Sequence, residues 1–196
     1  MLVLALGCAK DKSLDDNLTD ETDETAAPVQ EQLEPVGVIP ADDCQHVDFG
    51  DKACNFRLWD QNEDTWDLYE HKGDVILLDF STSWCPPCQS AGHYMQALQD
   101  TYGSEGVQIV TILIDGPTGG TAPTPEDIDI WVSGHGITTA PVLQGSRDKM
   151  FDTEAIEGYS IGGFPTYIYI GRDMTFYAGH VGFSEDYVKQ KIEEGL

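Results

Sequence analysis

Residues 84–88 read Trp-Cys-Pro-Pro-Cys, and they closely follow the apolar run Asp74-Val-Ile-Leu-Leu-Asp-Phe80. A short continuous apolar run is typical of a strand that is buried on both faces of a sheet. Prolines are tolerated in the first turn of a helix, so we expect a helix to begin at this point. The two thiols then lie one turn apart, close enough to form a disulfide and to exchange two electrons.

The residues after this motif predict a helix over 86–102. Apolar side chains follow one another there at alternating three- and four-residue spacing: Cys88, Ala91, Met95, Leu98 and Tyr102. Gly103 supplies the C-cap. Cys85 then lies just before the helix, where free N–H groups and the helix dipole favour a thiolate. Cys88 lies one turn further in and is more shielded. We therefore expect Cys85 to be the nucleophile and Cys88 the resolving thiol.

The remaining sequence predicts an α/β fold. We expect a hairpin with strands at 56–58 and 65–68, a buried strand at 107–114, helices at 125–134 and 147–157, a second hairpin at 166–170 and 175–178, and a last helix from Ser184 to about 194. A strand–helix–strand unit makes a parallel pair, and a terminal hairpin adds antiparallel strands. The sequence therefore predicts a mixed central sheet that is flanked by helices on both faces.

The N-terminal residues resemble a secretion signal. Residues 1–7 are apolar and lead directly into Cys8, which resembles the lipobox of bacterial lipoproteins. Ala5 and Leu6 depart from the usual pattern and the basic region is missing, so we interpret 1–8 as the remnant of a signal peptide whose start codon was assigned late. Cys8 is then the expected lipidation site. An N-terminus with an incidental cysteine is the alternative.

Residues 9–43 are rich in Asp, Glu, Thr and Pro and poor in apolar side chains. Such a segment cannot bury enough surface to offset the entropy of ordering, so we predict a disordered acidic tether. The globular domain is then expected over 44–196. In this domain Cys44 and Cys54 flank a polar, turn-rich stretch, and an oxidising compartment would let them pair as a structural disulfide.

The net charge of the chain argues against some classes of binding partner. The chain has 10 Lys and Arg against 35 Asp and Glu, a net charge of −25. Phosphate repels such a surface, which argues against nucleic acid and against anionic membrane surfaces. The sequence also lacks an apolar run of the about 20 residues that a membrane-spanning helix needs. Contact with a membrane is therefore expected only through a lipid anchor.

The motif around Trp84–Cys88 resembles the thioredoxin fold, in particular the extracytoplasmic TlpA/ResA-like disulfide oxidoreductases, over roughly 50–196. The resemblance implies that the hairpin at 56–68 is an addition before the core fold. It also implies that Asp79, six residues before Cys85, is a buried acid that assists proton transfer at the resolving cysteine.

The segment Gly163-Phe-Pro-Thr166 resembles the cis-proline segment of the same family. The resemblance implies that Pro165 is cis and packs beside the cysteines. Phe164 would present its backbone to an extended substrate. Trp84 suits core packing and the rim of the site equally well. His93 and Thr166 replace a proline and a glutamate of the family, which argues against its specialised role in cytochrome c maturation.

Other interpretations of the cysteine pair remain open from the residues alone. A Cys-x-x-Cys pair is also half of a zinc site, but a second pair at that spacing is missing and the histidines at 46, 71, 93, 135 and 180 form no clear ligand set, so we expect no metal. Thr82, three residues before Cys85, also occurs in peroxiredoxins, which need a proline where Leu78 stands. The loop 115–125 either shapes a substrate groove or is inert surface.

Together these features predict a membrane-tethered thiol-disulfide oxidoreductase, lipid-anchored in the periplasm, that reduces protein disulfides. Cys85 attacks, Cys88 resolves, Asp79 moves the proton, and Phe164 with Pro165 holds the substrate backbone. We expect no cofactor beyond the redox-active disulfide, a monomer, protein disulfides and thiols as substrates, and a membrane electron donor by family resemblance. The alternative is a non-catalytic module that uses the same scaffold to bind a metal or a partner.

Overall fold

The computed structural model describes residues 34–39, 48–151 and 158–196, all of which belong to one unit. Cys8, Cys44 and residues 1–33 lie outside these ranges. The lipidation site, most of the tether and the Cys44–Cys54 disulfide therefore stay predictions.

The central sheet contains five strands in the described part of the chain: β4 (Val75–Thr82), β5 (Val107–Asp115), β6 (Val142–Gln144), β7 (Thr166–Ile170) and β8 (Phe176–Val181). Their order is β6-β5-β4-β7-β8, with the first three parallel and the last two antiparallel to their neighbours. The mixed sheet predicted from the sequence is confirmed. The short strand β6 was not predicted, because three residues do not make a recognisable apolar pattern.

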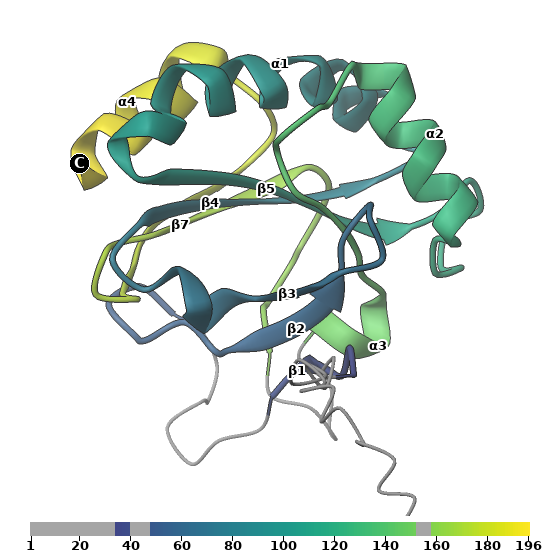
Figure 1. Cartoon of the computed structure of the whole chain (residues 1–196), viewed down its shortest axis with the longest axis horizontal. Coiled ribbons are helices and arrows are strands. Elements are labelled where there is room, and N and C mark those ends of the chain that lie inside the picture. Colours follow the sequence, from purple (N-terminus) through teal and green to yellow (C-terminus); the bar gives the residue numbers. More distant parts are fainter. Residues whose placement is uncertain (1–33, 40–47, 152–157) are drawn as a thin grey trace, which may run out of the picture. The chain divides into compact units, whose positions relative to one another are not determined.

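One face of this sheet is covered by α1 (Pro86–Tyr102), α2 (Pro125–His135) and α4 (Glu185–Gly195), which lie at the top of Figure 1. Val75 and Leu77 of β4 point to this face and share a cluster with Met95 and Ile192. Two short 3₁₀ helices, η1 (Leu68–His71) and η2 (Gly103–Glu105), precede β4 and β5. The predicted helix after Cys85 has the bounds that the spacing indicated.

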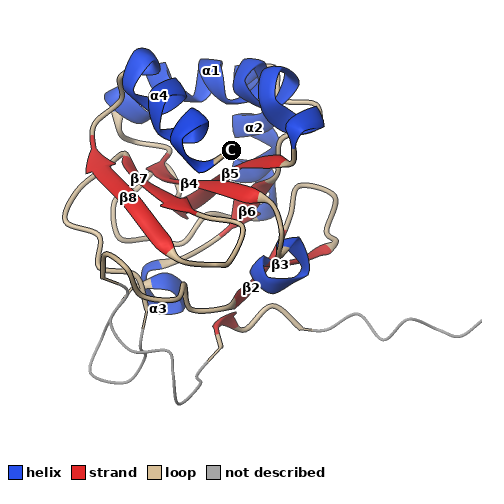
Figure 2. Ribbon diagram, turned by 90° about the vertical axis from the view of Figure 1, so that its left-hand side faces the viewer, coloured by secondary structure: helices blue, strands red, loops and turns tan. Residues whose placement is uncertain are grey.

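The opposite face is covered by an antiparallel sheet of β1 (Gly37–Val38), β2 (Phe56–Trp59) and β3 (Thr65–Asp67), together with α3 (Arg147–Met150). Alternate residues of β4, such as Ile76 and Phe80, pack here against Phe56. Figure 2 shows the two layers on either side of the central sheet. The predicted hairpin is therefore confirmed.

Two boundaries differ from the sequence prediction. Val38 was assigned to the tether, but it pairs with Phe56 in β2 and is 3% exposed, so ordered structure begins before residue 44. The pattern around a two-residue strand is too short to be recognised. The helix expected over 147–157 ends at Met150, because Phe151 has an extended backbone, and 152–157 lie outside the described residues.

None of the helices in the described ranges combines the length and the apolar character needed to cross a bilayer.

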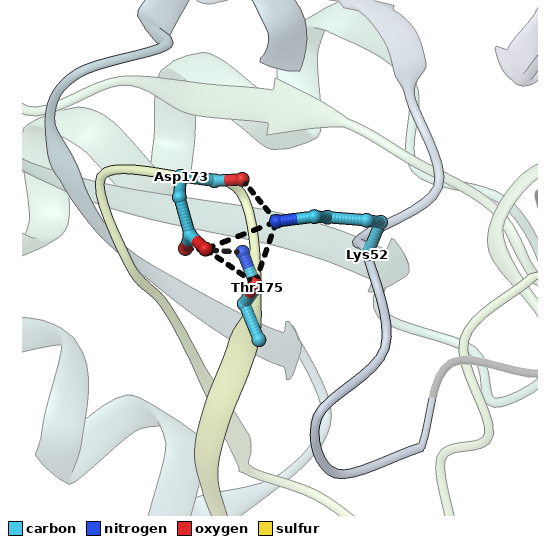
Figure 3. Close-up of polar contacts among 3 residues, drawn as sticks. All are labelled: Lys52, Asp173 and Thr175. Carbon is cyan, nitrogen blue, oxygen red and sulfur yellow. Dashed lines mark hydrogen bonds and ion pairs between the residues drawn. The ribbon is translucent and has the colours of Figure 1, made fainter.

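A polar contact ties the segment before β2 to the turn between β7 and β8. The Lys52 ammonium donates to the backbone oxygen of Asp173 at 2.8 Å, to its carboxylate at 3.0 Å and to the hydroxyl of Thr175 at 2.8 Å (Figure 3). Thr175 also donates its N–H and hydroxyl to the same carboxylate. The Lys52 bond, and next the Thr175 bonds, lower the pKa of Asp173 to about 2.

Replacing Lys52 with methionine is expected to raise the pKa of Asp173 from about 2 toward 3.8, the pKa of an aspartate without such partners. The bonds from Thr175 persist, so the rise is partial. Carboxyl carbon NMR titration measures it. Lys189→Met is the matched control, because Lys189 pairs with Glu185 on α4. A pKa that stays near 2 in Lys52→Met contradicts this assignment.

Candidate active site

The first turn of α1 is built around Cys85. Cys85 is the N-cap with an extended backbone (φ −90°, ψ 111°), and Pro86 and Pro87 occupy the first two helical positions. Because prolines have no N–H, the first free donor of the helix is that of Cys88, which points at the Cys85 Sγ over 3.3 Å. The two cysteines form a disulfide across this turn. Cys85 is 4% exposed and Cys88 is fully buried.

Asp79 lies on β4, on the face that α1 covers, since it follows Val75 and Leu77 at two-residue spacing. Its side chain is fully buried. Ser81 donates a hydrogen bond of 2.7 Å to Oδ1, whereas Oδ2 has no hydrogen-bond partner among the described residues. Burial raises the pKa of Asp79 to about 7, and the neutral donors Ser81 and Thr111 offset this only in part. Near neutral pH this carboxyl can therefore both accept and release a proton.

The third element of the site is the loop before β7. The Phe164–Pro165 peptide bond is cis, which confirms the prediction for Pro165. The Phe164 carbonyl oxygen lies 3.6 Å from the Cys85 Sγ, so this loop directly borders the cysteine pair. Pro165 is buried and Phe164 is partly buried.

A polar network that the sequence analysis missed joins these elements. The Trp84 indole N–H donates to Asp115 at the end of β5, over 3.0 Å. Arg147, at the start of α3, binds both carboxylate oxygens of Asp115 at 2.9 and 2.7 Å. The guanidinium also lies 5.6 Å from the centre of the Phe164 ring, and the planes of the Phe164 and Trp84 rings are perpendicular. The network thus connects Trp84, which precedes Cys85 in the chain, with Phe164, whose carbonyl oxygen lies beside the Cys85 sulfur.

Electrostatics decide the charge state of this network. The Asp115 side chain is 1% exposed and that of Arg147 is 44% exposed. Burial alone would raise the pKa of Asp115, but hydrogen bonds from Arg147, the Gly120 backbone and Trp84 outweigh it and hold the pKa below the usual value. The site rim therefore holds a buried carboxylate and a partly exposed guanidinium. Asp115 stands at the end of a predicted strand, a signal that could have identified it; nothing near Arg147 in the sequence points to the site.

The loop after Asp115 lies at the same end of the sheet as Cys85, as expected. A side chain at Gly119 would come within 3.4 Å of the Trp84 indole nitrogen, so the loop packs closely against that ring.

Two further predictions concern cysteine and metal chemistry. Cys54 is buried, and its expected partner Cys44 lies outside the described residues. Within those residues, no three His, Cys, Asp or Glu side chains gather in a way that could hold a metal ion. His135, the last residue of α2, instead reaches α1, with its ring nitrogens 2.7 Å from the Trp131 carbonyl and 3.1 Å from that of Gln89.

Comparison with known protein families identifies the family of this chain. Residues 49–157, a little over half of the chain, match the model of the AhpC/TSA family. The chain belongs to this family. A protein named thiol-disulfide oxidoreductase ResA from Oceanobacillus iheyensis is 30% identical over 133 residues, which cover 66% of this chain and 62% of that relative. The protein of the same name from Halalkalibacterium halodurans is 28% identical over 146 residues, covering 74% and 75%.

Solved structures share the fold. A thiol:disulfide interchange protein of the thioredoxin family from Chlorobium tepidum superposes with a TM-score of 0.62 at 22% identity, covering 76% of this chain and 97% of that one. The exposed lipoprotein thioredoxin Etrx1 from Streptococcus pneumoniae superposes with a TM-score of 0.58 at 25% identity, covering 71% and 98%. The thioredoxin fold and the resemblance to ResA-like proteins are therefore confirmed.

Asp79→Asn is expected to change how stability depends on pH. The folded protein keeps a proton on Asp79 up to about pH 7, whereas the unfolded chain releases it near 3.8. This group therefore stabilises the fold fully below about pH 4, and that contribution is lost as pH rises to about 7. Across this window the free energy of unfolding of the asparagine variant rises relative to that of wild type, by at most about 4 kcal/mol. Urea unfolding between pH 4 and 8 measures this difference. If the free energies of unfolding of wild type and Asp79→Asn change in parallel with pH, the assignment is contradicted.

Arg147→Met is expected to destabilise the oxidised protein by about 2 kcal/mol, because it leaves the buried Asp115 carboxylate without its strongest partner. The double variant Asp115→Asn, Arg147→Met is the matched control and should recover part of the loss, since no charge then remains buried. Urea denaturation at pH 7 gives both values. If the single variant is as stable as wild type, the ion pair has no structural role.

Proposed function

We propose that this protein is a thiol-disulfide oxidoreductase that reduces protein disulfides through Cys85 and Cys88. The observation that favours it most is the arrangement of three groups: a cysteine pair at a helix N-terminus, a cis-proline loop 3.6 Å from the outer sulfur, and a buried carboxyl on the strand below. The relatives named thiol-disulfide oxidoreductase support the same chemistry.

In the proposed reaction the reduced protein gives two electrons to a substrate disulfide. The Cys85 thiolate, stabilised by the Cys88 N–H and the helix dipole, attacks one substrate sulfur and releases the other as a thiolate that takes up a proton. Asp79 then takes the proton of the Cys88 thiol. The Cys88 thiolate attacks the Cys85 sulfur, which closes the protein disulfide and releases the second substrate sulfur as a thiolate that takes up a proton from solvent.

The substrate is proposed to bind in extended form along the Phe164–Pro165 loop. The Phe164 carbonyl beside Cys85 is a backbone acceptor at the place where a strand-like peptide would add. Trp84, whose side chain is 45% exposed, offers an aromatic surface next to the reacting sulfur. The loop over 115–125 packs against that ring and would form the outer wall of the groove.

The proposal extends to where the reaction occurs. We infer a lipid anchor at Cys8 and a periplasmic location, with a membrane protein as electron donor and a monomer as the working form. The apolar residues 1–7 before Cys8 support the anchor, and the structural neighbour from Streptococcus pneumoniae is described as an exposed lipoprotein. Labelling with a radioactive fatty acid in cells that express the gene from its own upstream region tests it: label in wild type but not in Cys8→Ala supports the anchor, and unlabelled wild type contradicts it.

Insulin reduction with dithiothreitol tests the activity. Wild type is expected to accelerate insulin precipitation, and Cys85→Ser to abolish the acceleration, because the attacking sulfur is lost. Cys88→Ser should stop after the first step and accumulate a mixed disulfide with the substrate, which intact-protein mass spectrometry detects. A wild type without activity would favour a scaffold that only binds a partner and would contradict the proposed function.

A further inference from the structure

An exposed cation stands at the rim of the cysteine site in a chain that is otherwise strongly acidic. Arg147 is the first residue of α3, which follows β6 in the chain. Its side chain is 44% exposed. The whole chain carries a net charge of −25, so most of its surface presents carboxylates to an approaching protein. A guanidinium at this particular place therefore calls for an explanation.

The guanidinium of Arg147 is held along one edge only. Such a group presents N–H donors along two edges, each of which fits a carboxylate. The Nε and Nη2 groups donate to the two oxygens of Asp115 over 2.9 and 2.7 Å, so Asp115 occupies the first edge. No described residue accepts a hydrogen bond from Nη1. The second edge, formed by Nη1 and Nη2, is thus available to a ligand.

Burial places the two members of this ion pair at different depths. The Asp115 side chain is 1% exposed, whereas that of Arg147 is 44% exposed. A molecule that arrives from solvent therefore meets the guanidinium before the carboxylate. Because the pair as a whole has no net charge, its attraction for an anion acts at contact and not over long distances.

Two aromatic rings fix the direction of the Arg147 side chain. The central carbon of the guanidinium lies 5.6 Å from the centre of the Phe164 ring and 5.9 Å from that of the Phe151 ring. Both distances are within the range of a cation–π contact. Together with the two hydrogen bonds to Asp115, these contacts order a long side chain before a ligand arrives. Binding then costs little additional side-chain entropy.

The same contacts bring Arg147 next to the expected path of the substrate. Phe164, whose ring lies near the guanidinium, has its carbonyl oxygen 3.6 Å from the Cys85 sulfur. Trp84, directly before Cys85, donates to the carboxylate that also holds Arg147. An extended peptide rises about 3.3 Å per residue. A side chain one or two positions from the substrate cysteine can therefore reach this part of the rim.

The other charged residues of α3 do not occupy the free edge. Asp148 is exposed, but no ion pair joins it to Arg147 in the described part of the chain, and successive helical residues point about 100° apart. Lys149 is partly buried, and its backbone and Cβ lie close to Gly37 of β1. The outer edge of the guanidinium therefore stays open to an anionic group.

We propose that Arg147 forms a subsite for a carboxylate of the substrate, so that the protein prefers disulfides whose cysteine has Asp or Glu beside it. This inference rests on the proposed function, because it names the substrate class of the same site. The substrate carboxylate accepts hydrogen bonds from Nη1 and Nη2, while Asp115 keeps Nε and Nη2. A carboxamide at the same position accepts only weaker, neutral hydrogen bonds, and an ammonium is repelled.

The test compares disulfide-linked peptide dimers that differ only in the residues flanking the cysteine, which are Glu, Gln or Lys. Full-length protein reduces them in the presence of dithiothreitol at pH 7 and about 150 mM salt, and chromatography follows the products. The rate with dithiothreitol alone is subtracted. The ratio of kcat/KM for the Glu and Gln peptides does not depend on the fraction of active protein, so a less stable variant still gives a valid ratio.

Arg147→Met is expected to lower the Glu/Gln ratio about fivefold, the upper range for an exposed ion pair. Dividing the wild-type ratio by that of the variant removes the intrinsic reactivity of the peptides. Arg147→Lys should keep only part of the preference, because it retains the charge but lacks the second edge. The Lys peptide should gain relative to the Gln peptide in Arg147→Met, since a repulsive contact is lost.

Arg172→Met is the matched control, because it changes the net charge by the same amount. Arg172 lies in the turn between β7 and β8 and donates to the carbonyls of Gly73 and Glu105. Gly73 precedes β4 and Cys85 follows it, so this arginine is at the other end of the sheet. The Glu/Gln ratio of Arg172→Met should equal that of wild type.

Two outcomes overturn the subsite. Equal Glu/Gln ratios in wild type and Arg147→Met would show that Arg147 does not contact the substrate. A similar fall in Arg147→Met and Arg172→Met would show an effect of net charge alone. If wild type reduces none of the three peptides faster than dithiothreitol does, the proposed function fails instead.

Discussion

A carboxyl group enclosed in the protein interior beside neutral partners is costly to ionise, and Asp79 is such a group at the centre of this sheet. Its position follows from β4, which is buried along its whole length and brings every second side chain beneath α1. The same strand leads directly into Cys85. The chain therefore places a carboxyl with a pKa of about 7 on the sheet face that α1 covers, and the proposed chemistry depends on that placement.

The other parts of the site fix geometry rather than protonation. The two prolines begin α1 and leave the Cys88 N–H as the donor to Cys85. The ion pair of Asp115 and Arg147 contacts both Trp84 and Phe164, the two aromatic residues beside Cys85. In a chain with a net charge of −25, a partly exposed guanidinium at this rim also makes the site less negative than its surroundings.

Much of this could be predicted from local patterns in the sequence. The apolar run before Cys85, the spacing after it and the Gly-Phe-Pro-Thr segment led to the strand, the helix and the cis bond at Pro165. The strands β1 and β6 were not predicted, because two or three residues are too few to show the alternation of apolar and polar side chains that marks a strand. The link between Asp115 and Arg147 was not predicted for another reason. It joins the end of β5 to the start of α3, two residues far apart in the sequence that only the tertiary fold brings together.

The central claim is that the thiol pair and the buried carboxyl form one proton-coupled unit. The reduction potential of Cys85–Cys88, measured against pH by equilibration with glutathione, tests it most directly, because a proton held by Asp79 enters the redox equilibrium. The account predicts a line whose slope changes near pH 7 and loses that change in Asp79→Asn. Lines of the same shape for wild type and Asp79→Asn across pH 5 to 9 would contradict it.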